Sequence, residues 1–354
     1  MNEYDIEIDL PQCGAYINLE ALLVYFDRAN EINRCFITSA MFNIPSLCEY
    51  FLSQGANINE IYYHRTALHN AAINNSKATV EFLLSHGAKI NKKDIDGGTP
   101  LHLTAFNNCT ETAELLLLHG ANISEKDYYG HTTLHHAAGS NSKEIAEFFI
   151  SHGANIHEIS NCGNTPLYQA AGSNNKETIE LLISHGANIN QKCVFGETAL
   201  HHASRSNSKE IVELLISNGA NINEISNYEK TALHYAAETN SKEAVELLIS
   251  NGANINVKAK DGRTPLSNAL GNNRKETAEV LISHGANINE KDNHGRTALH
   301  HASKKNYTET AELLISHGAN ISDKNKDGYT ALHLADKNNC KETAELLIAY
   351  GARI

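Results

Sequence analysis

The sequence has no tryptophan, only two methionines and five prolines among its 354 residues, and no long apolar run. Its longest apolar stretch, Ala21 to Phe26, is much shorter than the roughly 20 residues that a membrane-spanning helix needs. The N-terminal residues MNEYDIEIDLPQ also lack the basic start and apolar stretch of a secretory signal. We therefore expect a cytoplasmic protein without a membrane partner.

Paired cysteines and positive charge are scarce as well. The seven cysteines are odd in number and form no CxxC pair, which favours free thiols in a reducing compartment. The chain has 29 lysines and arginines against 41 aspartates and glutamates, so its net charge is −12. A surface that binds nucleic acid phosphates needs the opposite sign, and nucleic acid is therefore not expected as a partner.

The sequence does contain a motif that returns every 33 residues. A period of this length, with two helical patterns inside each copy, is typical of stacked-repeat proteins. The threonines that open the T-x-L of each copy are Thr66, Thr99, Thr132, Thr165, Thr198, Thr231, Thr264, Thr297 and Thr330. We therefore expect one elongated domain rather than a single globular core.

Each copy carries the signals of two short helices. The threonine suits an N-cap, and proline follows it in three copies, at the first helical position. The first helix should end at an asparagine that all nine copies share, because asparagine tolerates the left-handed conformation. Asn141 and Glu144 are expected to form a capping box for a second helix. That helix has Ala, Leu and Ile on its inner face and ends at glycine.

These residues resemble a known family. T-[AP]-L-H-x-A at a period of 33, with LLISHGANIN and a D-x-x-G loop, is similar to the ankyrin repeat over about residues 34–354. With its N-terminal helical cap, the chain also resembles ankyrin proteins of large families in some parasitic protozoa. The resemblance implies an all-α solenoid of stacked helix-turn-helix units with β-hairpin fingers. Fingers and first helices would line a concave groove that binds other proteins.

Three segments are expected along the chain. Residues 1–33 form an acidic tail and a capping helix over Asn18 to Phe26, residues 34–61 a degenerate first repeat that closes the stack, and residues 62–354 nine repeats. Glu229 stands where other loops have glycine, so an irregular finger is expected there. The last helix, Thr343 to Tyr350, is as apolar as an interior one, whereas a solenoid end normally has a polar outer face.

Neither a catalytic set nor a metal site is predicted. Seven of the histidines belong to T-x-L-H, and the resemblance implies that they form structural hydrogen bonds within their repeat. His136, His202 and His301 follow three of them, and equivalent residues two repeats apart lie roughly 20 Å from each other, too far to share a zinc ion with bonds of about 2 Å. G-x-S-x-G, Walker and H-E-x-x-H motifs are missing from the sequence. We therefore expect no enzyme, no cofactor and no metal.

The partner surface is predicted from side chains that differ between copies. Large apolar residues stand at finger tips and at first-helix positions that should face the groove, and exposed aromatic residues are typical of binding hot spots. The predicted contact residues are Tyr63, Ile73, Phe106, Tyr128, Tyr129, Phe195, Tyr228 and Tyr235. The expected function is a non-catalytic scaffold that binds an unknown protein or peptide there.

Two alternatives remain open. The tyrosines at the tips could pack on neighbouring fingers and serve only the fold. The apolar C-terminal repeat could instead pair with a second copy, which would make the chain a self-assembling structural protein and a homo-oligomer.

Overall fold

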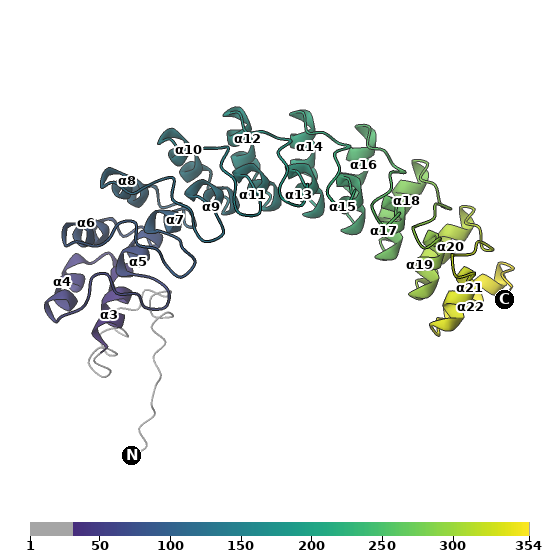
Figure 1. Ribbon diagram of the computed structural model, residues 1–354, viewed down its shortest axis with the longest axis horizontal. Helices are drawn as coiled ribbons and strands as arrows, with labels where there is room; N and C mark the ends of the chain where they lie inside the picture. The colour runs from purple at the N-terminus through teal and green to yellow at the C-terminus, as the bar shows by residue number, and fades with distance from the viewer. Residues whose placement is uncertain (1–30, 354) are drawn as a thin grey trace, which may run out of the picture. The chain divides into compact units, whose positions relative to one another are not determined.

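The computed structural model describes residues 31–353 of a chain with two compact units, Met1–Ala187 and Asn188–Ile354. The capping helix predicted over Asn18 to Phe26, and almost all of the predicted 1–33 segment, lie outside the described residues. Within each unit, pairs of short helices follow one another along the chain (Figure 1). The described part has helices and no named strand, so the predicted all-α repeat architecture is confirmed.

The first unit has two rows of helices, one formed by the first helix of each repeat and one by the second (Figure 1). Along the first row α5 packs on α7 and α9 on α11, and along the second row α6 packs on α8 and α10 on α12. The elements are α3 Ile32–Ser39, the 3-10 helix η1 Ala40–Phe42, α4 Pro45–Ser53, α5 Ala67–Ile73, α6 Lys77–Ser85, α7 Pro100–Thr104, α8 Thr110–Leu118, α9 Thr133–Gly139, α10 Lys143–Ser151, α11 Pro166–Gly172 and α12 Lys176–Ser184.

The second unit repeats the same arrangement. Here α13 packs on α15 and α19 on α21 in the first row, and α14 packs on α16 in the second. Its helices are α13 Ala199–Arg205, α14 Lys209–Ser217, α15 Ala232–Glu238, α16 Lys242–Ser250, α17 Pro265–Gly271, α18 Lys275–Ser283, α19 Ala298–Lys304, α20 Thr308–Ser316, α21 Ala331–Lys337 and α22 Lys341–Ala349.

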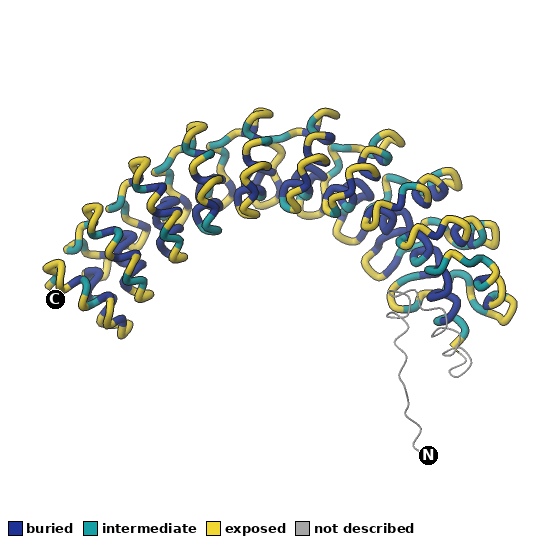
Figure 2. The backbone as a smooth tube through the Cα atoms, turned by 180° about the vertical axis from the view of Figure 1, so that it is seen from behind, coloured by how far each residue is buried: buried dark blue, intermediate teal, exposed yellow. Residues whose placement is uncertain are grey.

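Most of these helices are seven or nine residues long, and isolated helices need roughly 12 to 15 residues to be stable in water. Burial between neighbours supplies the missing stability. In α10, for example, Ile145, Ala146 and Phe149 are fully buried while the opposite face is exposed. Figure 2 shows the buried positions on the sides of the helices that face other helices.

The N-terminal end of the described chain also forms a helix-turn-helix. The helices α3 and α4 are separated by η1 and by Asn43, whose φ of 56° is left-handed like that of the later asparagines. Both α3 and η1 pack on α5, and α4 packs on α6. This helix-turn-helix lies mostly in the segment predicted as a degenerate first repeat, and its role as a cap of the stack stays a prediction.

The asparagine at the end of each first helix is left-handed in every complete repeat, as predicted. The φ values lie between 53° and 63° at Asn75, Asn108, Asn141, Asn174, Asn207, Asn240, Asn273, Asn306 and Asn339. Each asparagine therefore ends its helix at the backbone and turns the chain into the second helix.

The predicted capping box of Asn141 with Glu144 is wrong. The N-cap of α10 is Ser142, which makes no side-chain capping bond. Asn108, one repeat earlier, accepts a hydrogen bond from the backbone N–H of Ile145 at 3.1 Å and donates to the Glu144 carboxylate at 3.1 Å. The asparagine side chain thus satisfies an unpaired N–H in the next repeat rather than in its own.

Six of the seven T-x-L-H histidines also bond the next repeat. Nδ1 of His135 accepts a hydrogen bond from the Thr132 backbone N–H at 3.1 Å, and Nε2 donates to the carbonyl oxygen of Asn164 at 2.9 Å. Thr132 is the N-cap of α9, as predicted. Equivalent bonds join His69 to Gly98, His102 to His131, His201 to Lys230, His234 to Arg263 and His300 to Tyr329. Each of these imidazoles therefore forms hydrogen bonds both within its own repeat, as expected, and to the next repeat.

The fingers between repeats are hydrogen-bonded turns, with one isolated bridge between Tyr62 and Arg65 among the described residues. Within each unit, backbone bonds also join the tip of one finger to the tip of the next, as from Tyr128 N to Asp96 O at 2.9 Å. The irregular finger predicted at Glu229 is wrong. Glu229 has a φ of 55°, Ser226 N bonds Lys230 O at 2.9 Å, and Lys260 N bonds Tyr228 O at 2.9 Å. These bonds hold a non-glycine residue in the left-handed turn.

Stability should fall when the protein is acidified below about pH 6.5. Burial lowers the pKa of His69, His102, His135 and His234 to about 4, compared with about 6.5 in an unfolded chain. Between these values the unfolded chain binds more protons, so the stability contributed by the neutral imidazoles is complete above about pH 6.5 and is lost as the pH falls toward 4. Urea unfolding followed by circular dichroism should have a lower midpoint at about pH 5 than at about pH 7.5.

The matched control is His135→Gln, which keeps a donor and an acceptor but does not gain a proton in this range. Its midpoint should depend less on pH than that of the unchanged protein. Equal midpoints of the unchanged protein at both pH values would contradict the assignment.

Candidate functional site

The predicted finger-tip residues are exposed. In the first unit Tyr63, Tyr128 and Tyr129 are 58%, 63% and 60% exposed, and in the second unit Phe195 and Tyr228 are 49% and 56% exposed. Exposed apolar side chains that gather on one surface are typical of interaction sites, and aromatic residues are enriched in binding hot spots. In this article the finger-tip surface means Tyr63, Tyr128 and Tyr129 of the first unit, and the second unit has its own exposed tips at Phe195 and Tyr228.

The backbone beneath Tyr128 and Tyr129 is fixed from two sides. The Asp127 carboxylate oxygen Oδ1 accepts hydrogen bonds from the backbone N–H of Tyr129 at 2.9 Å and of His131 at 2.8 Å. The N–H of Tyr128 is bonded to the preceding finger. Because the backbone positions are held in this way, binding would cost little backbone entropy.

The alternative that tip tyrosines pack on neighbouring fingers is correct in part. A Cβ added at Gly97, where φ is 80°, would lie 2.7 Å from ring atoms of Tyr128. The ring therefore rests on the preceding finger and needs a glycine there. Tyr128 nevertheless keeps 63% of its surface exposed, so this packing uses only part of the ring.

Two hollows lie beside the tyrosines of the first unit. One, of about 470 Å³, is lined by Tyr128 together with Ile61, Ile95 and Asp94. A smaller one, of about 190 Å³, is lined by Tyr63 together with residues of α3 and η1. An apolar side chain of a partner could therefore enter next to either tyrosine.

Two predicted first-helix contacts of the same unit are less prominent. Phe106 is 44% exposed, and its ring lies 5.0 Å from that of His136. Ile73 ends α5 and is only half-buried, and its carbonyl oxygen accepts a hydrogen bond from the Asn107 amide at 2.8 Å. Phe106 thus offers a contact surface, whereas Ile73 contributes mostly to the link between two repeats.

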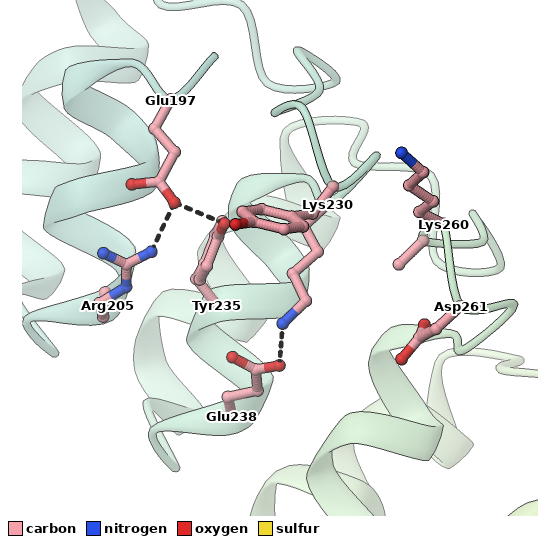
Figure 3. Close-up of a pocket in the computed structure, with 9 residues that line it drawn as sticks. Glu197, Arg205, Lys230, Tyr235, Glu238, Lys260 and Asp261 are labelled. Carbon is pink, nitrogen blue, oxygen red and sulfur yellow. Dashed lines mark hydrogen bonds and ion pairs between the residues drawn. The ribbon is translucent and has the colours of Figure 1, made fainter. Parts of the chain in front are cut away.

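The structure contradicts the prediction that Tyr235 is an exposed groove residue. Tyr235 is 4% exposed, and its hydroxyl donates a hydrogen bond to Glu197 Oε1 at 2.6 Å (Figure 3). The Arg205 guanidinium carbon lies 4.4 Å from the ring centroid and Lys230 Nζ lies 5.4 Å from it. These long side chains cover the ring. Burial and the Glu197 carboxylate raise the pKa of the phenol to about 12.

The residues around Tyr235 form a hollow of about 590 Å³ in the second unit (Figure 3). Two ion pairs cross it, Arg205 with Glu197 at 2.6 Å and Lys230 with Glu238 at 2.5 Å. The lining residues are Glu197, Arg205, Tyr228, Lys230, Tyr235, Glu238, Ala259, Lys260 and Asp261. Charges of both signs and the exposed ring of Tyr228 therefore meet at one place.

Comparison with known families explains this architecture. The profile described as ankyrin repeats (3 copies) matches overlapping windows at residues 18–94, 36–127, 91–160, 123–193, 155–226, 173–259, 224–292 and 290–354. The chain belongs to the ankyrin-repeat family. A comparison with curated proteins found no match. Ankyrin repeats generally serve protein-protein interaction, and ankyrin-repeat proteins are typically not enzymes.

One group of side chains in this ankyrin array was not predicted from the sequence. The repeat pattern relates His136 to His202 and His301 of other repeats, but the partners of His136 lie in its own repeat. Its Nε2 lies 2.9 Å from Asp127 Oδ2, and His131 Nδ1 lies 3.5 Å from the same oxygen. The signal was D-x-x-x-H-x-x-x-x-H, in which the finger places the first two residues beside the first helix.

The described helices of this ankyrin chain are all too short or too polar to cross a bilayer. Its described cysteines are free thiols, namely Cys35, Cys48, Cys109, Cys162, Cys193 and Cys340. Burial raises the pKa of Cys35 to about 12 and also raises those of Cys48 and Cys109. These three thiols are therefore poor nucleophiles at neutral pH.

Tyr235→Phe should destabilise the ankyrin array even though it removes only one oxygen atom. The change deletes a buried hydrogen bond to a carboxylate, which costs about 1 to 3 kcal/mol of the free energy of unfolding. Tyr228→Phe, at an exposed tip, should change it by less than about 0.5 kcal/mol. Urea unfolding of both variants measures the difference. Equal effects would contradict the buried role of Tyr235.

Proposed function

We propose that this ankyrin-repeat chain is a non-catalytic scaffold that binds a protein or an extended peptide on its finger-tip surface. The observation that carries the proposal is the exposure of Tyr63, Tyr128 and Tyr129 on finger tips that are bonded to one another. Tyrosine supplies a large contact area at a low entropy cost and is enriched in binding hot spots. Phe195 and Tyr228 would supply the contacts in the second unit.

The hollow beside Tyr228 supports a partner with polar and charged side chains. Arg205, Lys230 and Lys260 stand close to Glu197, Glu238 and Asp261, so both an acidic and a basic side chain could find a partner there. The net charge of −12 disfavours a nucleic acid. The free thiols and the helices described above support a cytoplasmic location, which is part of this proposal.

Tyr128→Ala combined with Tyr129→Ala should weaken partner binding about 10- to 30-fold, since each residue is placed as a hot spot. The partner is first isolated by affinity capture from the source cell and identified by mass spectrometry, and its dissociation constant is then measured by isothermal titration calorimetry. The melting temperature should change little, because both side chains lie mostly in solvent.

The matched control is Leu118→Ala. Leu118 is 77% exposed at the end of α8, in the second row of helices of the same unit and away from the fingers. It should bind the partner with unchanged affinity. Equal affinity of the double tyrosine variant and the unchanged protein would remove the finger-tip surface as the binding site.

A second candidate function is self-assembly through α22. Ile348 and Tyr350 are 56% and 47% exposed, whereas Ile315, the equivalent of Ile348 in α20, is half-buried by the next repeat. Pairing with a second copy would cover this apolar face. Sedimentation velocity should then show a mass that rises with concentration, and Ile348→Glu should leave a monomer. A concentration-independent monomer of the unchanged protein would eliminate this candidate.

A further inference from the structure

Asp127, His131 and His136 form a cluster with the dimensions of a metal site. Asp127 and His131 lie on the two arms of one finger, and His136 lies on α9 of the same repeat. One ligand atom from each residue falls within 4.8 Å of the other two. Asp127 Oδ2 lies 2.9 Å from His136 Nε2 and 3.5 Å from His131 Nδ1. Ligand atoms of a tetrahedral zinc site with bonds of about 2.1 Å are separated by about 3.4 Å.

The carboxylate is held in a ligand orientation. Its Oδ1 accepts the backbone bonds from Tyr129 and His131, which leaves Oδ2 directed at the two imidazoles. The Asp127 side chain is 4% exposed and the His136 side chain 21% exposed. Hydrogen bonds of this kind to a ligating carboxylate are usual around metal ions, where they fix the ligand and tune its basicity.

Gln169 from α11 supplies an outer contact. Its side-chain amide nitrogen lies 3.1 Å from His131 Nε2, which accepts a hydrogen bond from it in this orientation of the amide. For His131 Nδ1 to bind a metal, His131 Nε2 must carry the proton and donate a hydrogen bond to the amide oxygen of Gln169. Rotating the Gln169 amide by a half-turn places that oxygen next to Nε2. Such a partner fixes the tautomer and the ring orientation of a metal-bound histidine. Gln169 is therefore a positioning residue.

A second repeat of the same chain shows what a closed version of this cluster looks like. Asp292, Arg296 and His301 occupy the same repeat positions five periods later. There Arg296 Nε lies 2.9 Å from Asp292 Oδ2, and His301 Nε2 lies 3.0 Å from the same oxygen. The guanidinium supplies the cation, so no charge is left for a metal to neutralise. In the first unit His131 takes the place of Arg296, so that cluster has no guanidinium beside its carboxylate.

We propose that Asp127, His131 and His136 bind one Zn²⁺ ion. Two imidazoles and one carboxylate give three protein ligands, and a water molecule would take the fourth position of the tetrahedron. Imidazole ligands favour zinc over magnesium or calcium, which prefer oxygen. The ion would lie beside the exposed rings of Phe106 and Tyr129, where it places a positive charge next to the finger-tip surface. It would also clamp the finger to α9.

The test uses the untagged full chain, stripped of metal with a chelator and titrated with Zn²⁺ in a calorimeter. Titration with Co²⁺, followed by visible absorption, reports whether the site is tetrahedral. The unchanged protein should have one Zn²⁺ site per chain that is tighter than any further site. Co²⁺ bound there should show the intense visible absorption of a tetrahedral complex. His136→Ala and His131→Arg should each weaken this binding at least about 100-fold, and Gln169→Leu about tenfold.

Two controls separate loss of the zinc site from loss of the fold. His131→Arg reproduces the Asp292, Arg296 and His301 arrangement that the chain already folds, and circular dichroism verifies its helix content. His301→Ala removes a histidine from the closed cluster and should leave zinc binding unchanged. The proposal is overturned if the unchanged protein has no high-affinity Zn²⁺ site, or if His131→Arg and His136→Ala bind Zn²⁺ with the same affinity as the unchanged protein. The cluster would then be a hydrogen-bond network alone.

Discussion

The fold depends on buried polar groups that only a neighbouring repeat can satisfy. His135 Nε2 finds its acceptor at Asn164 O, and the N–H of Ile145 finds its acceptor at Asn108. A buried donor without a partner costs about 1 to 3 kcal/mol, a large fraction of the stability of a short helix pair. One repeat alone would leave such groups unpaired, so hydrogen bonding adds to apolar burial in making the stack cooperative.

This division of roles leaves the fingers free to vary. The backbone bonds between tips and the left-handed turns are made by main-chain atoms, and even Glu229 fits the turn without disturbing them. Some tip side chains add to these contacts, as Asn161 does by donating to Tyr128 O at 2.9 Å and Tyr128 by packing on Gly97, but the main-chain bonds are made whatever the side chain. A surface that does not carry the fold can be given over to recognition, as the exposed tyrosines suggest.

The sequence predicts those parts of the structure that repeat. The threonine caps, the left-handed asparagines and the two helices of each copy follow from local chemistry at a fixed period, and the structure has them. It does not predict that Tyr235 is buried, because the cover comes from Arg205 and Glu197 in the preceding repeat, whose rotamers no local pattern specifies. Glu144 was assigned to Asn141 for the same reason, whereas its partner is Asn108 in the preceding repeat. In both cases the deciding partner lies about one period away along the chain.

The positions held by Asp127, His131 and His136 show how one backbone frame can carry different chemistry. In one repeat an aspartate faces two imidazoles, in another it faces an arginine and an imidazole, and in a third the matching places hold Ser226, Lys230 and Tyr235. The main chain is the same at each, with a turn closed by a bond of about 3 Å across the finger. Charge at these sites is therefore set by side chains alone. A solenoid that fixes three positions in space at every period can thus place a cation, a buried phenol or an ion pair there without changing its fold.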